Sequence, residues 1–183
     1  MLNECLIGRI IQCHIDHGDP ESFVVGRLAY FDGDWFLMQD LSPAGRWNGL
    51  ALYMQSDIVS VCEFSDYLQR IVSLINCRNE SEPFIPPMSN DPLMSLLLYA
   101  RNSGRVIGLE LHASGYRDIY GTIDSLTRNT LCINQIDEFG QTDGKSYLSV
   151  EAITRCYLDD EESKCLEMLR EYVHAQDKQT SPL

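Results

Sequence analysis

Potential metal ligands gather near the N-terminus, at Cys13, His14, Asp16, His17 and Asp19. Thiolate, imidazole and carboxylate groups are the ligands that zinc takes, and a site needs three or four of them in tetrahedral geometry. No pair of these residues stands at the spacing of a structural zinc site. We therefore expect a solvated loop that holds no metal, and we keep a metal-dependent enzyme at this loop as an alternative.

Oxygen-bearing side chains also gather in the stretch from Asp137 to Gly144. A calcium loop needs such side chains at alternate positions before its glycine, but Phe139 and Gln141 stand where aspartate or asparagine is preferred. The flanking segments are typical of strands, whereas helices flank an EF-hand loop. The sequence therefore predicts a tight turn in which Gly140 and Gly144 adopt positive φ.

Motifs of the common catalytic classes are absent from the sequence. It contains no Gly-x-Ser-x-Gly, no phosphate-binding loop and no His-Glu-x-x-His. His112 and His174 are isolated in strand-like and helix-like segments. We therefore predict no catalytic residues and no cofactor, and we expect a protein that is not an enzyme. A triad dispersed along the chain stays open, because such triads are recognised by geometry and not by spacing.

The chain contains one pattern twice. Four positions recur after the same interval of 95 residues, namely Gly26, Gly45, Gly49 and Ile58, which return as Gly121, Gly140, Gly144 and Ile153. If Gly8 is aligned with Gly108, the loop after the first strand is five residues longer in the first copy than in the second. The extra residues lie around His14–Pro20. The duplication predicts two similar structural units.

Each copy reads as five short strands followed by a helix. Asp32-Gly33 between apolar runs predicts a hairpin, and Ser65 predicts the start of a helix. Short strands joined by tight turns remove their exposed edges by closing into a small barrel. The apolar face of the first helix is predicted at Phe64, Tyr67, Leu68, Ile71, Val72 and Ile75.

Prolines and helix-capping residues mark the boundaries between these segments. Residues 79–91 form a proline-rich linker that separates a first domain, 1–78, from a second, 92–183. Asp91 and Pro92 predict the start of a helix that leads into the second copy. Asp159 with Glu162 predicts the capped start of a closing helix.

Composition indicates an acidic globular protein, with 44% hydrophobic and 22% charged residues and a net charge of −13. Nucleic-acid binding needs clustered lysine and arginine, and the chain has no such cluster, so charge argues against it. Seven cysteines form no even framework, and we see neither a signal peptide nor a membrane-spanning run. We expect a reduced, cytoplasmic protein away from membranes, with small cores that favour packing between the halves or with a second copy.

The second copy resembles the Sm-like family of small β-barrels over about residues 105–158, and the first copy does so more weakly over residues 5–62. The resemblance rests on a helix before five strands, on Gly121-Thr-Ile and on Asn129. It implies a mainly β fold with helices (α+β). In this fold two tandem five-stranded barrels are each followed by a helix, and a further helix leads into the second barrel. The repeat is also similar to domains of bacterial proteins with a Gly…Asp-Gly…Asp-Ile pattern.

RNA binding is what the family resemblance implies for function. The residues that carry it in the family are not matched here, because Thr127 stands where an acid is expected and Ser149-Val-Glu-Ala-Ile replaces the second motif. We therefore favour a non-enzymatic binding or scaffold protein that contacts a protein partner, and the negative charge favours a basic one. A toxin inhibitor of the immunity type fits the same acidity, and an RNA-binding Sm-like protein is the alternative.

The partner site is predicted from a difference between the copies. The first copy has aromatic side chains at Trp35, Trp47, Tyr53 and Phe36, where the second has Thr130, Thr142, Leu148 and Leu131. Aromatic residues are enriched at protein interfaces, so we predict that Trp35, Trp47 and Tyr53 bind a partner. The alternative is that they pack between the two barrels.

Overall fold

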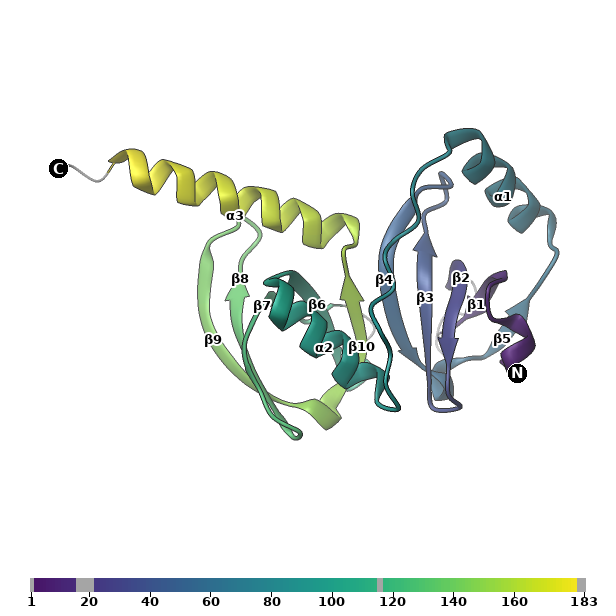
Figure 1. Cartoon of the computed structure of the whole chain (residues 1–183), viewed down its shortest axis with the longest axis horizontal. Helices are drawn as coiled ribbons and strands as arrows, with labels where there is room; N and C mark the ends of the chain where they lie inside the picture. The colour runs from purple at the N-terminus through teal and green to yellow at the C-terminus, as the bar shows by residue number, and fades with distance from the viewer. Residues whose placement is uncertain (1, 16–21, 115–116, 181–183) are drawn as a thin grey trace. The chain divides into compact units, whose positions relative to one another are not determined.

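The computed structural model describes residues 2–15, 22–114 and 117–180. The chain forms two compact units, Met1–Pro92 (unit 1) and Leu93–Leu183 (unit 2). Both combine antiparallel strands with helices, so the chain is α+β (Figure 1). No helix among the described residues has the length and apolar character needed to cross a membrane.

Unit 1 contains the five strands and the helix that the sequence predicts. Its strands stand in the order β5-β1-β2-β3-β4 and each neighbouring pair is antiparallel. In chain order the elements are η1 (Glu4–Leu6), β1 (Ile10–His14), β2 (Phe23–Phe31), β3 (Trp35–Leu41), β4 (Trp47–Met54), η2 (Gln55–Asp57), β5 (Ser60–Cys62) and α1 (Asp66–Arg78).

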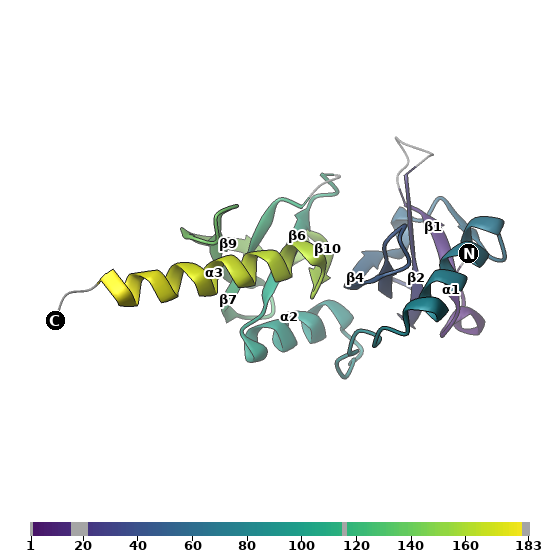
Figure 2. The same cartoon turned by 90° about the horizontal axis from the view of Figure 1, so that it is seen from above.

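Unit 2 repeats this arrangement, with one long helix before its first strand. Its strand order, β10-β6-β7-β8-β9, is the same succession of fifth, first, second, third and fourth strand. The elements are α2 (Pro92–Ser103), β6 (Val106–Leu111), β7 (Ile119–Leu126), β8 (Thr130–Ile136), β9 (Thr142–Ser149), η3 (Val150–Ala152), β10 (Ile153–Leu158) and α3 (Glu161–Thr180). Figures 1 and 2 show the C-terminal part of α3 extending past the strands of this unit.

The closing helices α1 and α3 pack on the same positions of their units. In unit 1 buried Val25, Leu41 and Ile71 cluster with Ile10. In unit 2 the residues at the matching positions, Tyr120, Ile136, Leu166 and Val106, form the corresponding cluster. Ile71 is fully buried and Leu166 is 3% exposed. Burial of one such side chain stabilises the fold by about 1.5–3 kcal/mol, which anchors each helix to its strands.

Two of the repeated glycines are required by the approach of other backbone. A side chain at Gly26 would overlap the Gln39 carbonyl oxygen, and one at Gly121 would overlap that of Asn134. Gly45 and Gly140 have φ of 68° and 78° and lie against the closing helices at Leu74 and Leu169. A side chain there would collide with the helix, so the repeated spacing preserves the contact between turn and helix.

The strand register corrects our alignment of the two copies near the N-terminus. Ile11 lies opposite Gly26, and Ile107 lies opposite Gly121. Gly8 therefore matches Gly104 and not Gly108, and both adopt positive φ. Gly8 precedes Gly26 by 18 positions and Gly104 precedes Gly121 by 17, so unit 1 has one extra residue and not five.

Each closing helix begins after a residue with positive φ that turns the chain out of the fifth strand. Phe64 has φ of 61° and Asp159 has φ of 57°. Ser65 caps α1 as predicted, since its Oγ accepts from the Leu68 N–H at 3.2 Å. The predicted cap at Asp159 is wrong by one residue. Asp160 caps α3 by accepting from the Ser163 N–H at 3.1 Å, because Asp159 is used for the turn.

The acidic stretch near Asp137 is a turn, as the sequence predicts. Asp137 Oδ1 accepts from the backbone N–H groups of Phe139 at 3.0 Å and Gln141 at 2.8 Å. The side chain thus closes the turn on its own backbone.

The proline-rich segment packs on the strands of unit 1. Gln39 Nε2 donates to the Pro83 carbonyl at 2.7 Å, and the Tyr30 hydroxyl donates to the Ser89 carbonyl at 3.3 Å. Side chains of β2 and β3 therefore hold the backbone of this segment at two points.

We predict that Gly140→Ala destabilises the protein more than Gly144→Ala. Both glycines have nearly the same φ, 78° and 79°, so both variants carry left-handed strain of about 1 kcal/mol. Only at Gly140 does the added carbon meet α3, with the Arg170 nitrogen 2.6 Å away. This overlap should cost about 1–3 kcal/mol more. Urea unfolding checks the difference, and equal losses would contradict the contact between turn and helix.

Candidate functional site

The structure places Trp35 and Trp47 at opposite ends of the β3–β4 hairpin. Trp35 pairs with Met54 at one end, and Trp47 pairs with Leu41 at the other. Both are half-buried. Trp47 packs on the cluster that holds α1. The two indoles therefore do not form one continuous surface within unit 1.

Tyr53 belongs to the interior of the folded chain, at 1% exposed. Its ring stacks on Phe36 with centroids 5.1 Å apart, and its hydroxyl donates to Asp40 Oδ2 at 3.0 Å. The face of the Tyr53 ring and its hydroxyl group are therefore both in contact with other residues of the chain. Partner binding by Trp35, Trp47 and Tyr53 stays a prediction, and the structure does not bring the three side chains together.

The N-terminal group of potential metal ligands lies partly outside the described residues, which do not include Asp16, His17 and Asp19. Cys13 is fully buried, and burial raises the pKa of its thiol to about 12. The protonated thiol is a poor metal ligand and a poor nucleophile. Within the described ranges no three His, Cys, Asp or Glu side chains come together in a way that could hold a metal ion.

An open groove in unit 1, between the start of β1 and helix α1, is the strongest candidate site. Its volume is about 760 Å³, which falls in the range of ligand sites. Ile10, Leu68 and Val72 contribute apolar walls, and the ring of Phe64 stands at its edge, 77% exposed. We name it the unit 1 groove.

Two arginines line the unit 1 groove. Arg9 Nη1 contacts Glu63 Oε2 at 2.8 Å, and the Arg9 side chain is 52% exposed. Arg27 contacts Glu82 at 2.5 Å, and its guanidinium carbon lies 5.3 Å from the centroid of the Trp47 ring. Trp47 is therefore a cation–π partner of one arginine that lines the groove.

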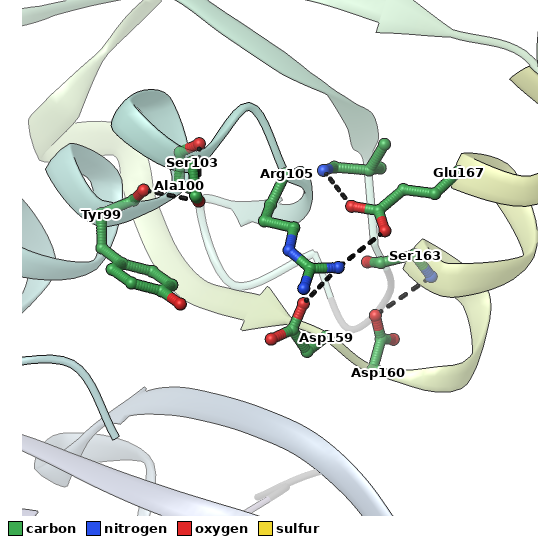
Figure 3. A network of polar contacts seen from close by, with 9 residues as sticks. Tyr99, Ala100, Ser103, Arg105, Asp159, Asp160, Ser163 and Glu167 are labelled. Carbon is green, nitrogen blue, oxygen red and sulfur yellow. Dashed lines mark hydrogen bonds and ion pairs between the residues drawn. The ribbon is translucent and has the colours of Figure 1, made fainter. Parts of the chain in front are cut away.

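The matching place in unit 2 is filled by an ionic network around Arg105 (Figure 3). Arg105 Nη1 lies 3.0 Å from Glu167 Oε2 and 3.5 Å from Asp159 Oδ1. The second carboxylate oxygen of Glu167 accepts from the Val106 N–H at 2.9 Å. These acids, Asp159 foremost, raise the pKa of Arg105 above its ordinary value. The space that remains is smaller, about 340 Å³, and largely charged.

Two residue differences explain why one place is open and apolar and the other is closed and charged. Arg9 stands at the position of Arg105, so the basic residue is retained. Phe64 stands at the position of Asp159, and Val72 stands at the position of Glu167. Unit 1 therefore keeps the guanidinium but replaces both of its carboxylate partners with apolar side chains.

Sequence reasoning missed this groove, although its signals are in the chain. The dipeptide Gly-Arg opens the first strand in both copies, at Gly8-Arg9 and Gly104-Arg105. The misplaced alignment on Gly108 hid this match. The apolar face predicted for α1 also includes a residue that does not belong to the core. Val72 is 36% exposed and lines the groove.

Comparisons with known proteins identified no relative of this chain. Searches against protein-family models, curated proteins and solved structures found no match to this chain.

We predict that thiol labelling at pH 8 will separate Cys13 from the exposed cysteines. Cys5, Cys77 and Cys165 are exposed and should react with iodoacetamide within minutes. Cys13 should stay unlabelled in the native protein, because its raised pKa removes the reactive thiolate. Peptide mass spectrometry gives the readout, and labelling in denaturant, where all seven should react, is the control. Native labelling of Cys13 at the rate of Cys5 would contradict its burial.

Proposed function

We propose that this is a non-enzymatic binding or scaffold protein that acts through protein–protein contacts, and that the unit 1 groove is its partner site. The observation that carries the proposal is the pair of differences between the copies. Where unit 2 fills the place beside its Gly-Arg with Asp159 and Glu167, unit 1 leaves an open groove with Phe64 and Val72 at its walls.

Exposed apolar side chains around the groove favour a protein partner. Phe64 is 77% exposed and Val72 is 36% exposed, and both line the groove. Apolar side chains grouped on the surface beside a groove are typical of interaction sites. Aromatic anchors surrounded by a polar rim carry most of the binding energy in protein interfaces.

We propose that each unit closes as a small Sm-like barrel, as the sequence resemblance implies. The identical strand succession of the two units supports this, and so does the helix α2 before the first strand of unit 2. The barrel is the scaffold in this proposal and supplies no activity of its own, since fold does not imply function.

RNA binding has less support than a protein partner. The net charge of −13 opposes phosphate binding, and the chain has no cluster of lysine and arginine. RNA binding is therefore the alternative that the crosslinking experiment tests.

We predict that a photo-crosslinker at position 64 captures a protein partner in extracts of the native organism. Benzoylphenylalanine at Phe64 should give a discrete crosslinked product that survives ribonuclease. Val72→Glu should reduce the amount of this product at least about tenfold. The reason is that an unpaired charge buried in an interface costs about 1.4 kcal/mol or more. The same group at Phe139, which is 63% exposed in unit 2, is the positional control.

A charge control separates loss of the groove from a general effect of acidity. Tyr172 is 62% exposed on α3, and Tyr172→Glu adds the same charge there and should leave the product intact. Equal products from positions 64 and 139 would contradict the proposed site. A product that contains RNA, together with binding to total RNA that falls steeply with salt, would favour the RNA-binding alternative.

A further inference from the structure

The ionic network of unit 2 holds a carboxylate at the place that matches the unit 1 groove. Glu167 reaches Arg105 with one carboxylate oxygen, at 3.0 Å, and the N–H of Val106 with the other, at 2.9 Å. The carboxylate is thus held by a guanidinium and by the backbone at the start of the first strand. Charge-assisted bonds of this kind are stronger than those between neutral groups.

Unit 1 retains the residues that hold this carboxylate but lacks the carboxylate itself. Arg9 and Ile10 stand at the positions of Arg105 and Val106, while Val72 replaces Glu167. The Arg9 side chain remains 52% exposed. Its acidic neighbour in the described chain is Glu63, whereas Arg105 lies within 3.5 Å of two carboxylates.

We propose, on the basis of the proposed function, that the unit 1 groove recognises an aspartate or glutamate side chain flanked by apolar residues on the partner protein. The partner's carboxylate takes the place at Arg9 that Glu167 takes at Arg105. Its apolar neighbours lie against Leu68, Val72 and Phe64.

The pairing of Arg9 with Glu63 does not prevent this recognition. A guanidinium has five N–H donors, and Arg105 shares its own between two carboxylates. The Arg9–Glu63 pair is partly exposed, at 52% and 30%, and pairs of that kind are weak. A second carboxylate that arrives with apolar surface can therefore join or replace Glu63.

The backbone at Phe64 supports a binding role for the groove edge. Phe64 has φ of 61°, a region that bulky residues rarely adopt, whereas Asp159 at the matching position is a residue type that tolerates it. Phe64 gains little burial in return, since it is 77% exposed. A strained and exposed aromatic residue is costly for folding alone and useful at a contact site.

The local chemistry differs from the overall charge. A net charge of −13 attracts a basic partner at long range. At the groove Glu82 pairs with Arg27, so the acidic residue is recognised by the partly exposed Arg9 and not by a net positive charge. A partner with a basic surface and one acidic anchor among apolar residues satisfies both.

The first test places the carboxylate in the groove by mutation, as Val72→Glu. We expect the introduced carboxylate to bind Arg9, so that its pKa falls below the ordinary value for glutamate. A carboxylate with a lowered pKa stabilises the folded protein at neutral pH, and this stabilisation is lost as the pH falls through the lowered value. Val72→Glu should therefore unfold at a higher temperature than Val72→Gln at pH 7, and this difference should shrink as the pH is lowered toward 3.

The readout for this variant is the titration, by NMR, of the carboxyl carbon introduced at position 72. Adding Arg9→Gln to Val72→Glu should restore the ordinary pKa of this carboxyl group while the fold is retained. A pKa at or above the ordinary value for glutamate in the presence of Arg9 would overturn the proposal.

The second test supplies the carboxylate on a separate molecule. The probes are the peptides acetyl-Leu-Glu-Phe-amide and acetyl-Leu-Gln-Phe-amide, added at millimolar concentration to the ¹⁵N-labelled protein. We expect both to shift the signals of Ile10, Phe64 and Val72, and the Glu peptide to bind roughly threefold to fivefold tighter, as the free energy of a partly exposed ion pair allows. Glu63→Gln should widen this ratio, and Arg9→Gln should bring it to one.

The outcomes distinguish this inference from the proposed function. If both peptides bind the groove equally and Arg9→Gln changes nothing, recognition of a carboxylate is wrong while the groove remains a binding site. If neither peptide shifts any groove signal, the groove is not a peptide site and both proposals fail.

Discussion

Each unit depends on the packing of its closing helix on the first three strands. A unit of about ninety residues buries a small core, so the helix must supply a large part of it. Ile71 and Leu166 insert at matching positions, and the turn between the third and fourth strands reaches the helix through Gly45 and Gly140. The helix N-terminus is fixed at the same time by the turn out of the fifth strand. The space between helix and first strand is therefore set by the fold, and side chains decide whether it is filled.

The number and type of elements could be predicted from the sequence because they rest on local signals. Asp32-Gly33 predicts its hairpin because Asp32 Oδ1 accepts from the following N–H groups, at 2.9 Å for Asp34 and 2.8 Å for Trp35. Ser65 predicts its helix for a similar reason. The glycine spacing predicts the duplication because the turn-to-helix and strand-to-strand contacts leave no room for a side chain.

The candidate site could not be predicted in the same way, because it depends on register and on contacts far apart in sequence. Matching Gly8 to Gly108 is reasonable from spacing alone, and only the pairing of Ile11 with Gly26 and Ile107 with Gly121 corrects it. Helical periodicity places Val72 on the apolar face of α1 but does not say where the strands stop covering that face. The aromatic residues of the first copy likewise led to the prediction that Tyr53 binds a partner. In the structure its ring lies in the interior and stacks on Phe36.

The two copies differ in the side chains that they place between the closing helix and the first strand. In unit 2 Asp159 serves both the left-handed turn and Arg105, and Glu167 fixes α3 to the start of β6. In unit 1 the same positions hold Phe64, which strains the turn, and Val72, and both side chains are exposed to water. Natural proteins place residues that do not suit the local structure mainly at functional sites, and other parts of the structure supply the lost stability. Here the compensation is visible, because α1 keeps Leu68 and Ile71 buried, at 3% and 0% exposed, and its Ser65 cap intact. Because unit 2 fills this place with its own side chains and unit 1 leaves it open, we propose that the binding function lies in unit 1.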